Sequence, residues 1–187
     1  IIDHPICRHD VVSLTGLERD LRSVSRTPNL VVITPNACHD GHDSPCASGE
    51  PGGLVSADQF LRTWAPRILA SPAFRKDGLL LVVTDESGFT GPDANTACCN
   101  EQSGPNVAQA GQAGPGGGLV GALAVSPFIA PGTVSSTPYN HYSMLRSIED
   151  YFGLTHLGFA AQPGLATFGS DVFTRRTGGE GGGGPHR

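Results

Sequence analysis

The stretch PNACHDGHDSPC, residues 35–46, gathers two histidines, two aspartates and two cysteines in a chain that has seven histidines in all. Imidazoles and carboxylates at this density are the groups that bind divalent cations or transfer protons. The cluster follows an apolar run, LVVIT at 30–34, so it stands where a buried strand would end. The candidates for a chemical site are therefore His39, Asp40, His42 and Asp43.

Cys38 and Cys46 bracket this cluster. A disulfide between them would close a short loop and stabilise it by roughly 2.5 kcal/mol on the chain-entropy model. Reduced cysteines or metal-binding cysteines are the alternatives, although no second pair of ligands completes the tetrahedral site of a zinc finger. Cys98 and Cys99 are neighbours, which pair only with strain, so one of them is expected to reach Cys7 or a residue outside the chain.

Two other apolar runs lead to the same kinds of side chain. LLLVVT at 79–84 is followed at once by Asp85 and Glu86, and LVGALAV at 119–125 leads through a proline-rich loop to His141. Ligands of open α/β sheets bind beyond the carboxyl ends of parallel strands. If the three strands are parallel, they deliver carboxylates and imidazoles to one edge of the sheet. Such a mixed ligand set suits Zn, Mn or Fe better than Ca or Mg.

Helical patterns lie between these strands. Apolar residues spaced three and four apart predict helices over 14–24, 56–71 and 141–154, the last of them stopping at a glycine. Ser56 is expected to cap the second helix, which Pro66 should kink or split. Strands that alternate with helices predict an α/β fold, with helices on both faces of a mostly parallel sheet.

Composition narrows the class of protein. A chain of 187 residues suffices for one domain, expected over 1–176, and the glycine-rich end at 177–187 is expected to be a disordered tail. The net charge of −5 offers no basic surface for nucleic acid. No run approaches the ~20 apolar residues of a membrane span. Because the chain opens without methionine, any targeting segment is expected to lie upstream.

Three segments, in this order, resemble the bacterial phosphoesterase family of acid phosphatases and phospholipases C, within the alkaline phosphatase superfamily. They are NLVVITPNACHDGHD, ADQFLRTWAPRILASPAFRKDGLLLVVTDES and GGGLVGALAVSPFIAPGTVSSTPYNHYSMLRSIEDYFGL. The similarity runs from about Cys7 to Phe173. It implies hydrolysis of phosphate esters with a divalent metal ion (Zn, Mn, Fe or Ca) in an αβα sandwich. The chain would be a partial domain that lacks the N-terminal part.

The resemblance also implies roles for individual side chains. The metal ligands would be Asp85, Glu86, Asp40 and His42. His39 and Asp43 are neighbours of two of these ligands and would orient them without binding the metal themselves. His42 and His141 would be catalytic, binding the metal or the phosphate oxygens and holding the charge that develops in the transition state.

One expected part of a phosphoesterase is missing. The family attacks phosphorus with a Ser or Thr near the N-terminal end of its domain, a region that would precede residue 1, and Thr34, Thr84, Ser87 and Ser143 do not match that motif. The expected substrate is a small phosphorylated molecule or a phospholipid head group. Phospholipase C or sulfatase specificity and a non-catalytic, secreted metal-binding module are the alternatives. Many relatives are exported, so a secreted or cell-surface location is expected.

Overall fold

The computed structural model describes residues 4–87 and 118–175, which contain both helices and strands. The chain divides after Leu80 into two compact units. The single domain expected over 1–176 stays a prediction, and the expected tail at 177–187 lies outside the described residues. Within the described ranges, no helix combines the length and the apolar character that a membrane span requires.

The described part of the first unit is helical. Its elements are α1 (Pro5–Asp10), a 3-10 turn η1 (Leu14–Gly16), α2 (Leu17–Asp20), α3 (Gly53–Ala70) and α4 (Pro72–Asp77). The helix predicted over 14–24 is therefore much shorter than expected. The backbone carbonyl of Asp20, the last residue of α2, accepts a hydrogen bond from the Thr27 hydroxyl, 2.9 Å away. The serine-rich segment that follows forms turns and does not continue the helix.

Helix α3 begins three residues before the predicted start, so Ser56 is not its cap. Gly52 caps the helix with a positive φ of 68°, and a side chain at this position would collide with the carbonyl of Asp43. Ser56 lies buried in the first turn and accepts a hydrogen bond from the Gly52 N–H, 2.9 Å away. Pro66 lies inside the helix without splitting it.

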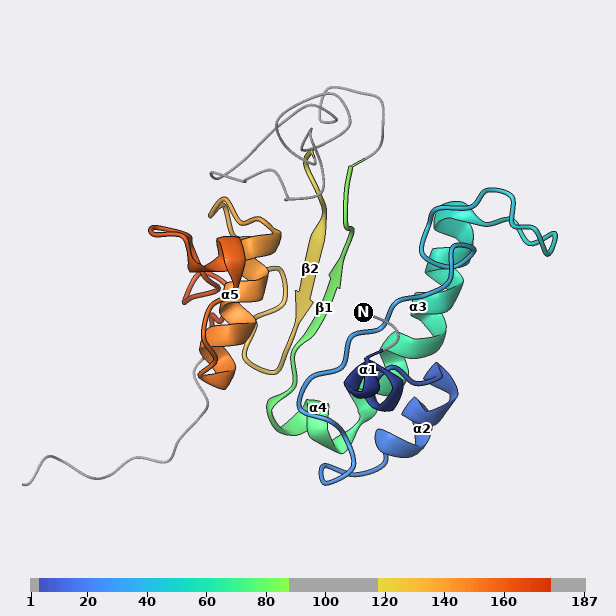
Figure 1. Ribbon diagram of the computed structural model, residues 1–187, viewed down its shortest axis with the longest axis horizontal. Coiled ribbons are helices and arrows are strands. Elements are labelled where there is room, and N and C mark those ends of the chain that lie inside the picture. Colours follow the sequence, from blue (N-terminus) through green and yellow to red (C-terminus); the bar gives the residue numbers. More distant parts are fainter. Residues whose placement is uncertain (1–3, 88–117, 176–187) are drawn as a thin grey trace, which may run out of the picture. The chain divides into compact units, whose positions relative to one another are not determined.

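The sheet has two strands, β1 (Leu80–Val83) and β2 (Ala122–Val125), which run antiparallel (Figure 1). The expected edge of three parallel strands does not form among the described residues. The segment 30–34 is extended but is assigned to no strand, and Leu30 and Val32 are 52% and 81% exposed. A strand needs a neighbour for its backbone groups, and the described residues provide none for this segment.

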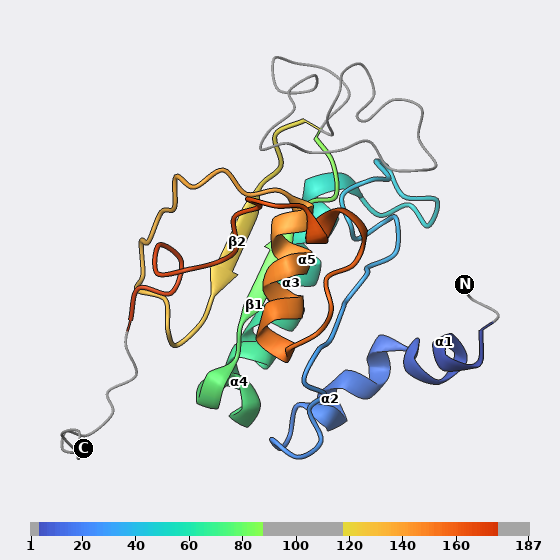
Figure 2. The ribbon, with the colours of Figure 1, turned by 60° about the vertical axis from the view of Figure 1, so that its left-hand side comes forward.

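Helix α5 (His141–Phe152) confirms the prediction for 141–154. Asn140 caps its start in a reciprocal capping box with Ser143, and Gly153 ends it in the left-handed conformation, with φ of 63°. After α5 the chain forms the 3-10 turn η2 (Gly158–Ala161) and returns along the helix toward its N-terminal end (Figure 2).

Candidate active site

The loop at 35–46 contains the predicted disulfide. Cys38 and Cys46 are bonded with their Cα atoms 5.2 Å apart, and Cys46 is only 5% exposed. Cys7 is a free thiol, and the other expected partners, Cys98 and Cys99, lie outside the described residues. The disulfide closes the base of the loop that carries both candidate histidines.

Hydrogen bonds inside this loop fix its polar side chains. Asp40 Oδ1 accepts from the His42 N–H at 2.8 Å, so one carboxylate oxygen shapes the turn itself. His42 Nδ1 lies 3.0 Å from Asp43 Oδ1. A carboxylate on one ring nitrogen is the usual support for a histidine that binds metal through the other. His39 Nδ1 lies 2.6 Å from the side-chain oxygen of Asn36, which orients this ring in the same way.

Glu50, which the sequence analysis did not single out, comes next to this loop. Ligand atoms of Cys38, His39 and Glu50 lie within 4.8 Å of one another, close enough for a metal ion. A cysteine binds metal as a thiolate, however, and the Cys38 sulfur is already bonded to Cys46. With the disulfide formed, this group offers one imidazole and one carboxylate, which is too few for a dedicated site.

The second unit brings two predicted site residues together. His141 Nε2 lies 2.8 Å from the backbone carbonyl oxygen of Asp85, although the two residues are 56 positions apart. A carbonyl can only accept, so Nε2 carries the hydrogen and a neutral His141 has its lone pair on Nδ1. The residues Asp85 and Glu86 are exposed at the end of β1, where Thr84 N–H donates to Gly121 O at 3.3 Å.

A polar network that the sequence analysis missed lies just before His141. Asp171 Oδ2 accepts from the hydroxyl of Tyr139 at 2.8 Å and from that of Ser135. The hydrogen bonds from Ser135 and Tyr139 hold the pKa of Asp171 well below its usual range. Desolvation, together with the bond to Asp171, raises the pKa of Tyr139. No motif surrounds Asp171 in the sequence, so only the fold reveals this contact.

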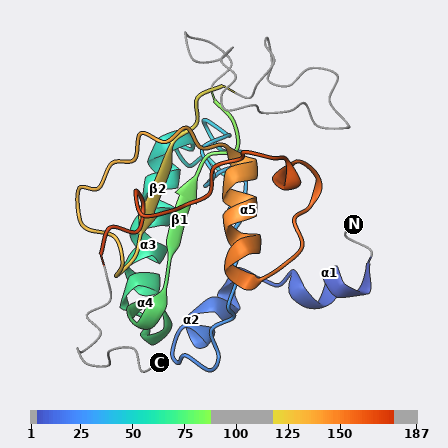
Figure 3. The same cartoon turned by 90° about the vertical axis from the view of Figure 1, so that its left-hand side faces the viewer.

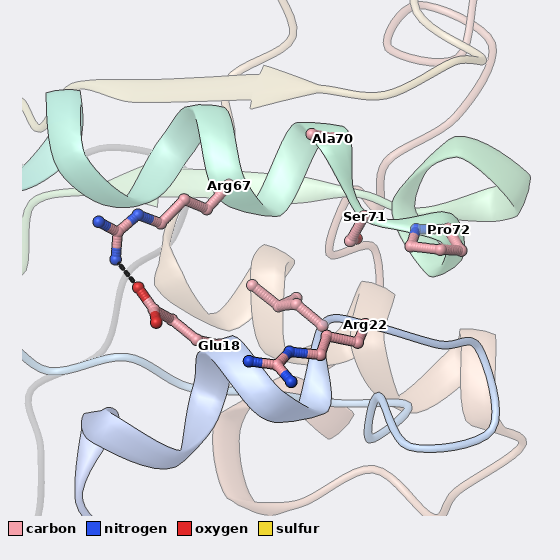
Figure 4. A pocket seen from close by; sticks show the side chains of 7 residues that line it. Glu18, Arg22, Arg67, Ala70, Ser71 and Pro72 are labelled. Atoms are coloured by element: carbon pink, nitrogen blue, oxygen red, sulfur yellow. Dashed lines mark hydrogen bonds and ion pairs between the residues drawn. The ribbon is translucent and has the colours of Figure 1, made fainter.

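The first unit also contains an open cavity of about 470 Å³ between α2 and the α3–α4 corner (Figure 4). Its lining residues are Glu18, Leu21, Arg22, Arg67, Ala70, Ser71 and Pro72. Arg67 forms an ion pair with Glu18 and lies over the ring of Trp64, 5.2 Å from its centroid. None of the predicted site residues lines this cavity, so it does not belong to the site argued from the sequence.

Comparisons with known proteins agree with the motifs. The model of the Phosphoesterase family matches residues 9–155. An acid phosphatase of Aspergillus fumigatus is 28% identical over 148 residues, which are 79% of this chain and 26% of that protein. A "Probable acid phosphatase" of Kluyveromyces lactis is 27% identical over 133 residues, 71% of this chain and 25% of that protein.

The chain thus spans about a quarter of the length of the curated relatives it matches. Both of these relatives are fungal, and the bacterial branch named from the motifs stays a prediction. No solved structure matches the chain. The family model nevertheless covers more than half of the 187 residues, including the loop at 35–46 and the contact between Asp85 and His141, and the chain belongs to the phosphoesterase family.

Proposed function

We propose that this chain is part of a metal-dependent hydrolase of phosphate monoesters, of the acid phosphatase type. The observation that carries the proposal is that the family match spans every predicted site residue, from His39 to His141. The similarity to two fungal acid phosphatases supports the reaction class. For the whole domain we propose the αβα sandwich with a mostly parallel sheet, in which the exposed apolar segment 30–34 would find strand neighbours.

The proposed metal ligands are Asp40, His42, Asp85 and Glu86. Asp40 and His42 belong to the disulfide loop, and Asp85 and Glu86 follow β1. Zn, Mn and Fe bind ligand sets that combine carboxylate oxygens with an imidazole nitrogen, whereas Ca binds imidazole less well. Asp43, 3.0 Å from His42 Nδ1, supplies the carboxylate that commonly backs a metal-binding histidine. When bound, the cation would neutralise phosphoryl oxygens and lower the pKa of the attacking hydroxyl.

The chain's own residues would bind and polarise the substrate. His141 is the first residue of α5, where the helix dipole favours an anion. Its Nδ1 lone pair would bind the metal, whereas the protonated ring would donate from Nδ1 to a phosphate oxygen or to the leaving group. Where it does not bind the metal, His42 would hold charge that develops in the transition state. We do not assign the nucleophile to Ser143, because its side chain is fully buried and completes the capping box of α5.

A secreted or cell-surface location is part of the same proposal, and the disulfide at the base of the loop supports an oxidising compartment. The substrate would be a small phosphorylated molecule, with a phospholipid head group as the nearest competitor. A non-catalytic, secreted metal-binding module remains the alternative from another class.

The test combines elemental analysis with a phosphatase assay on the longest product of the gene. We expect a transition metal to copurify, and chelation to abolish release of p-nitrophenol from p-nitrophenyl phosphate until the metal is restored. Asp85→Ala should lower both the metal content and the activity. Asp58→Ala, which removes an exposed carboxylate that pairs with Arg62 on α3, is the matched control.

Each outcome of this test bears on one reading. Wild-type metal content and activity in Asp85→Ala would refute the ligand assignment. Cleavage of p-nitrophenyl phosphorylcholine in preference to the monoester would favour the phospholipase C alternative. A protein that binds metal and cleaves neither ester would favour the non-catalytic module.

A further inference from the structure

The chain that follows α5 is tied to the loop that precedes it. Asp171 Oδ2 accepts hydrogen bonds from Ser135 and Tyr139 of that loop. Tyr139 stands directly before Asn140, the cap of α5, and His141 is the first residue of the helix. One carboxylate oxygen therefore fixes two points of the chain immediately ahead of His141.

Other contacts strengthen this tie, and we call residues 167–175 the C-terminal clasp. The Phe168 ring meets the Tyr139 ring edge-on, with 5.0 Å between centroids, and the Phe168 N–H donates to Ser147 Oγ of α5 at 2.9 Å. Thr174 Oγ1 accepts from the Ala130 N–H at 2.9 Å. The clasp, the reddest part of the ribbon in Figures 2 and 3, runs from the N-terminal end of α5 toward β2.

The connection from Tyr139 to His141 is short and rigid. Asn140 Oδ1 accepts from the Ser143 N–H at 2.9 Å, and the Asn140 N–H donates to Ser143 Oγ at 3.2 Å. These bonds fix the first turn of α5 relative to the backbone that enters it. A displacement of Tyr139 would consequently move His141, whose ring must stay 2.8 Å from the Asp85 carbonyl to keep its tautomer.

We propose that Asp171 is a positioning residue for His141: by holding Ser135 and Tyr139, it keeps the imidazole on the Asp85 carbonyl with Nδ1 available to the substrate. This inference rests on the proposed function for the catalytic use of His141. Asp171 lies 16 residues beyond the end of the family match and carries no role in the site argued from the sequence.

The direct test reads the tautomer of His141 by NMR of protein labelled with ¹⁵N-histidine, with the signal assigned through His141→Gln. In the wild type we expect the Nε2–H tautomer with an unprotonated Nδ1 at a pH where the ring is neutral. Asp171→Ala should give a mixture of tautomers. Asp171→Asn keeps an acceptor oxygen of the same shape and should retain most of the wild-type signal. Asp150→Ala, which removes an exposed carboxylate on α5, should leave the signal unchanged.

The second measurement is hydrolysis of p-nitrophenyl phosphate by the same variants of the longest gene product. Asp171→Ala should lower kcat roughly tenfold and change KM by no more than about twofold. A misplaced His141 imidazole would be badly oriented for the reaction, while the affinity of the enzyme for its substrate would stay nearly the same. Asp171→Asn should recover most of kcat. If Asp171→Ala fails to fold, Tyr139→Phe removes the hydroxyl that Asp171 accepts, together with its 3.2 Å contact to Thr167 O, and should shift the His141 tautomer in the same direction.

The two readouts separate the inference from the function it rests on. A changed His141 tautomer with unchanged activity would uphold the positioning role and refute a catalytic His141. An unchanged tautomer in both Asp171→Ala and Tyr139→Phe would overturn the positioning role, whatever happens to the activity.

Discussion

The disulfide loop at 35–46 and the pair formed by Asp85 and His141 present similar side chains but are held in different ways. In the loop, the imidazoles of His39 and His42 find their partners within three residues along the chain. The pair joins residues 56 positions apart, through a strand end and a helix start.

This difference shows what each region depends on. The loop is built from local turns and one covalent bond, so its geometry is largely independent of the sheet. The pair exists only while the β1 end, the capping box at Asn140 and the clasp at 167–175 stay in place. The loop at 35–46, whose site residues are close in the sequence, therefore depends mainly on local contacts. The contact between Asp85 and His141 depends on the tertiary structure.

The largest effect should come from breaking the pair itself. His141→Ala removes the imidazole and should lower kcat for p-nitrophenyl phosphate by roughly 10²–10⁴-fold, the usual contribution of a positioned acid, base or charge stabiliser. The free energy of unfolding should change little, because the capping box at Asn140 and Ser143 remains.

Steady-state kinetics together with chemical denaturation check this expectation. His156→Ala is the control, since that histidine lies beyond the end of α5 and pairs with Asp150 of the helix. Equal kinetic losses in the two variants would show that His141 has no special place in the reaction.

The disulfide loop should respond in stability before it responds in activity. Replacing both Cys38 and Cys46 with alanine should cost about 2.5 kcal/mol on the chain-entropy model. In this variant, hydrogen exchange should become faster at the Asp43 N–H, which donates to Ala37 O at 2.8 Å. Hydrogen exchange in α5 should stay unchanged. Cys7→Ala, which removes a free thiol, is the matched control. Exchange that accelerates equally in α5 would contradict a self-contained loop.

Sequence reasoning predicted features that depend on near neighbours. The Cys38–Cys46 bridge follows from a bracketed loop, and the length of α5 follows from its apolar stripe and the glycine that ends it. The start of α3 was missed, because Gly52 is required by the close approach of the Asp43 carbonyl and not by any property of the helix sequence. The pattern marked Ser56 as a cap when it is a buried acceptor in the first turn.

Pairing over longer distances was harder to predict. Apolar runs without alternation indicate covered strands, but they do not state direction, and the two strands that form are antiparallel. Contact between Asp171 and Tyr139 links residues 32 positions apart with no motif to mark either one. For the site, the sequence indicated that Asp85 and His141 would approach each other, but not that a backbone carbonyl would make the contact.

The smallest effect should appear in the stability of the protein at acid pH, through the Asp171 carboxylate of the clasp. The pKa of Asp171 is lower in the folded chain than in the unfolded chain, because Ser135 and Tyr139 donate to its carboxylate. The folded state therefore binds this proton less readily, and the carboxylate contributes stability above its unfolded pKa of about 3.9. That contribution is lost as the pH falls from about 5 through 3 and toward the lowered folded pKa.

Thermal unfolding between about pH 6 and pH 3 isolates this contribution, because the other carboxylates titrate alike in the wild type and in Asp171→Asn. The acid-induced fall in Tm should be smaller in the variant by about 2 °C, since an ion-dependent contact near solvent is partly screened. Asp150→Asn serves as the exposed control and should follow the wild type. If Asp171→Asn follows the wild-type curve over the whole range, the clasp gains nothing from the ionised carboxylate, and Asp171 would have to act on His141 through shape alone.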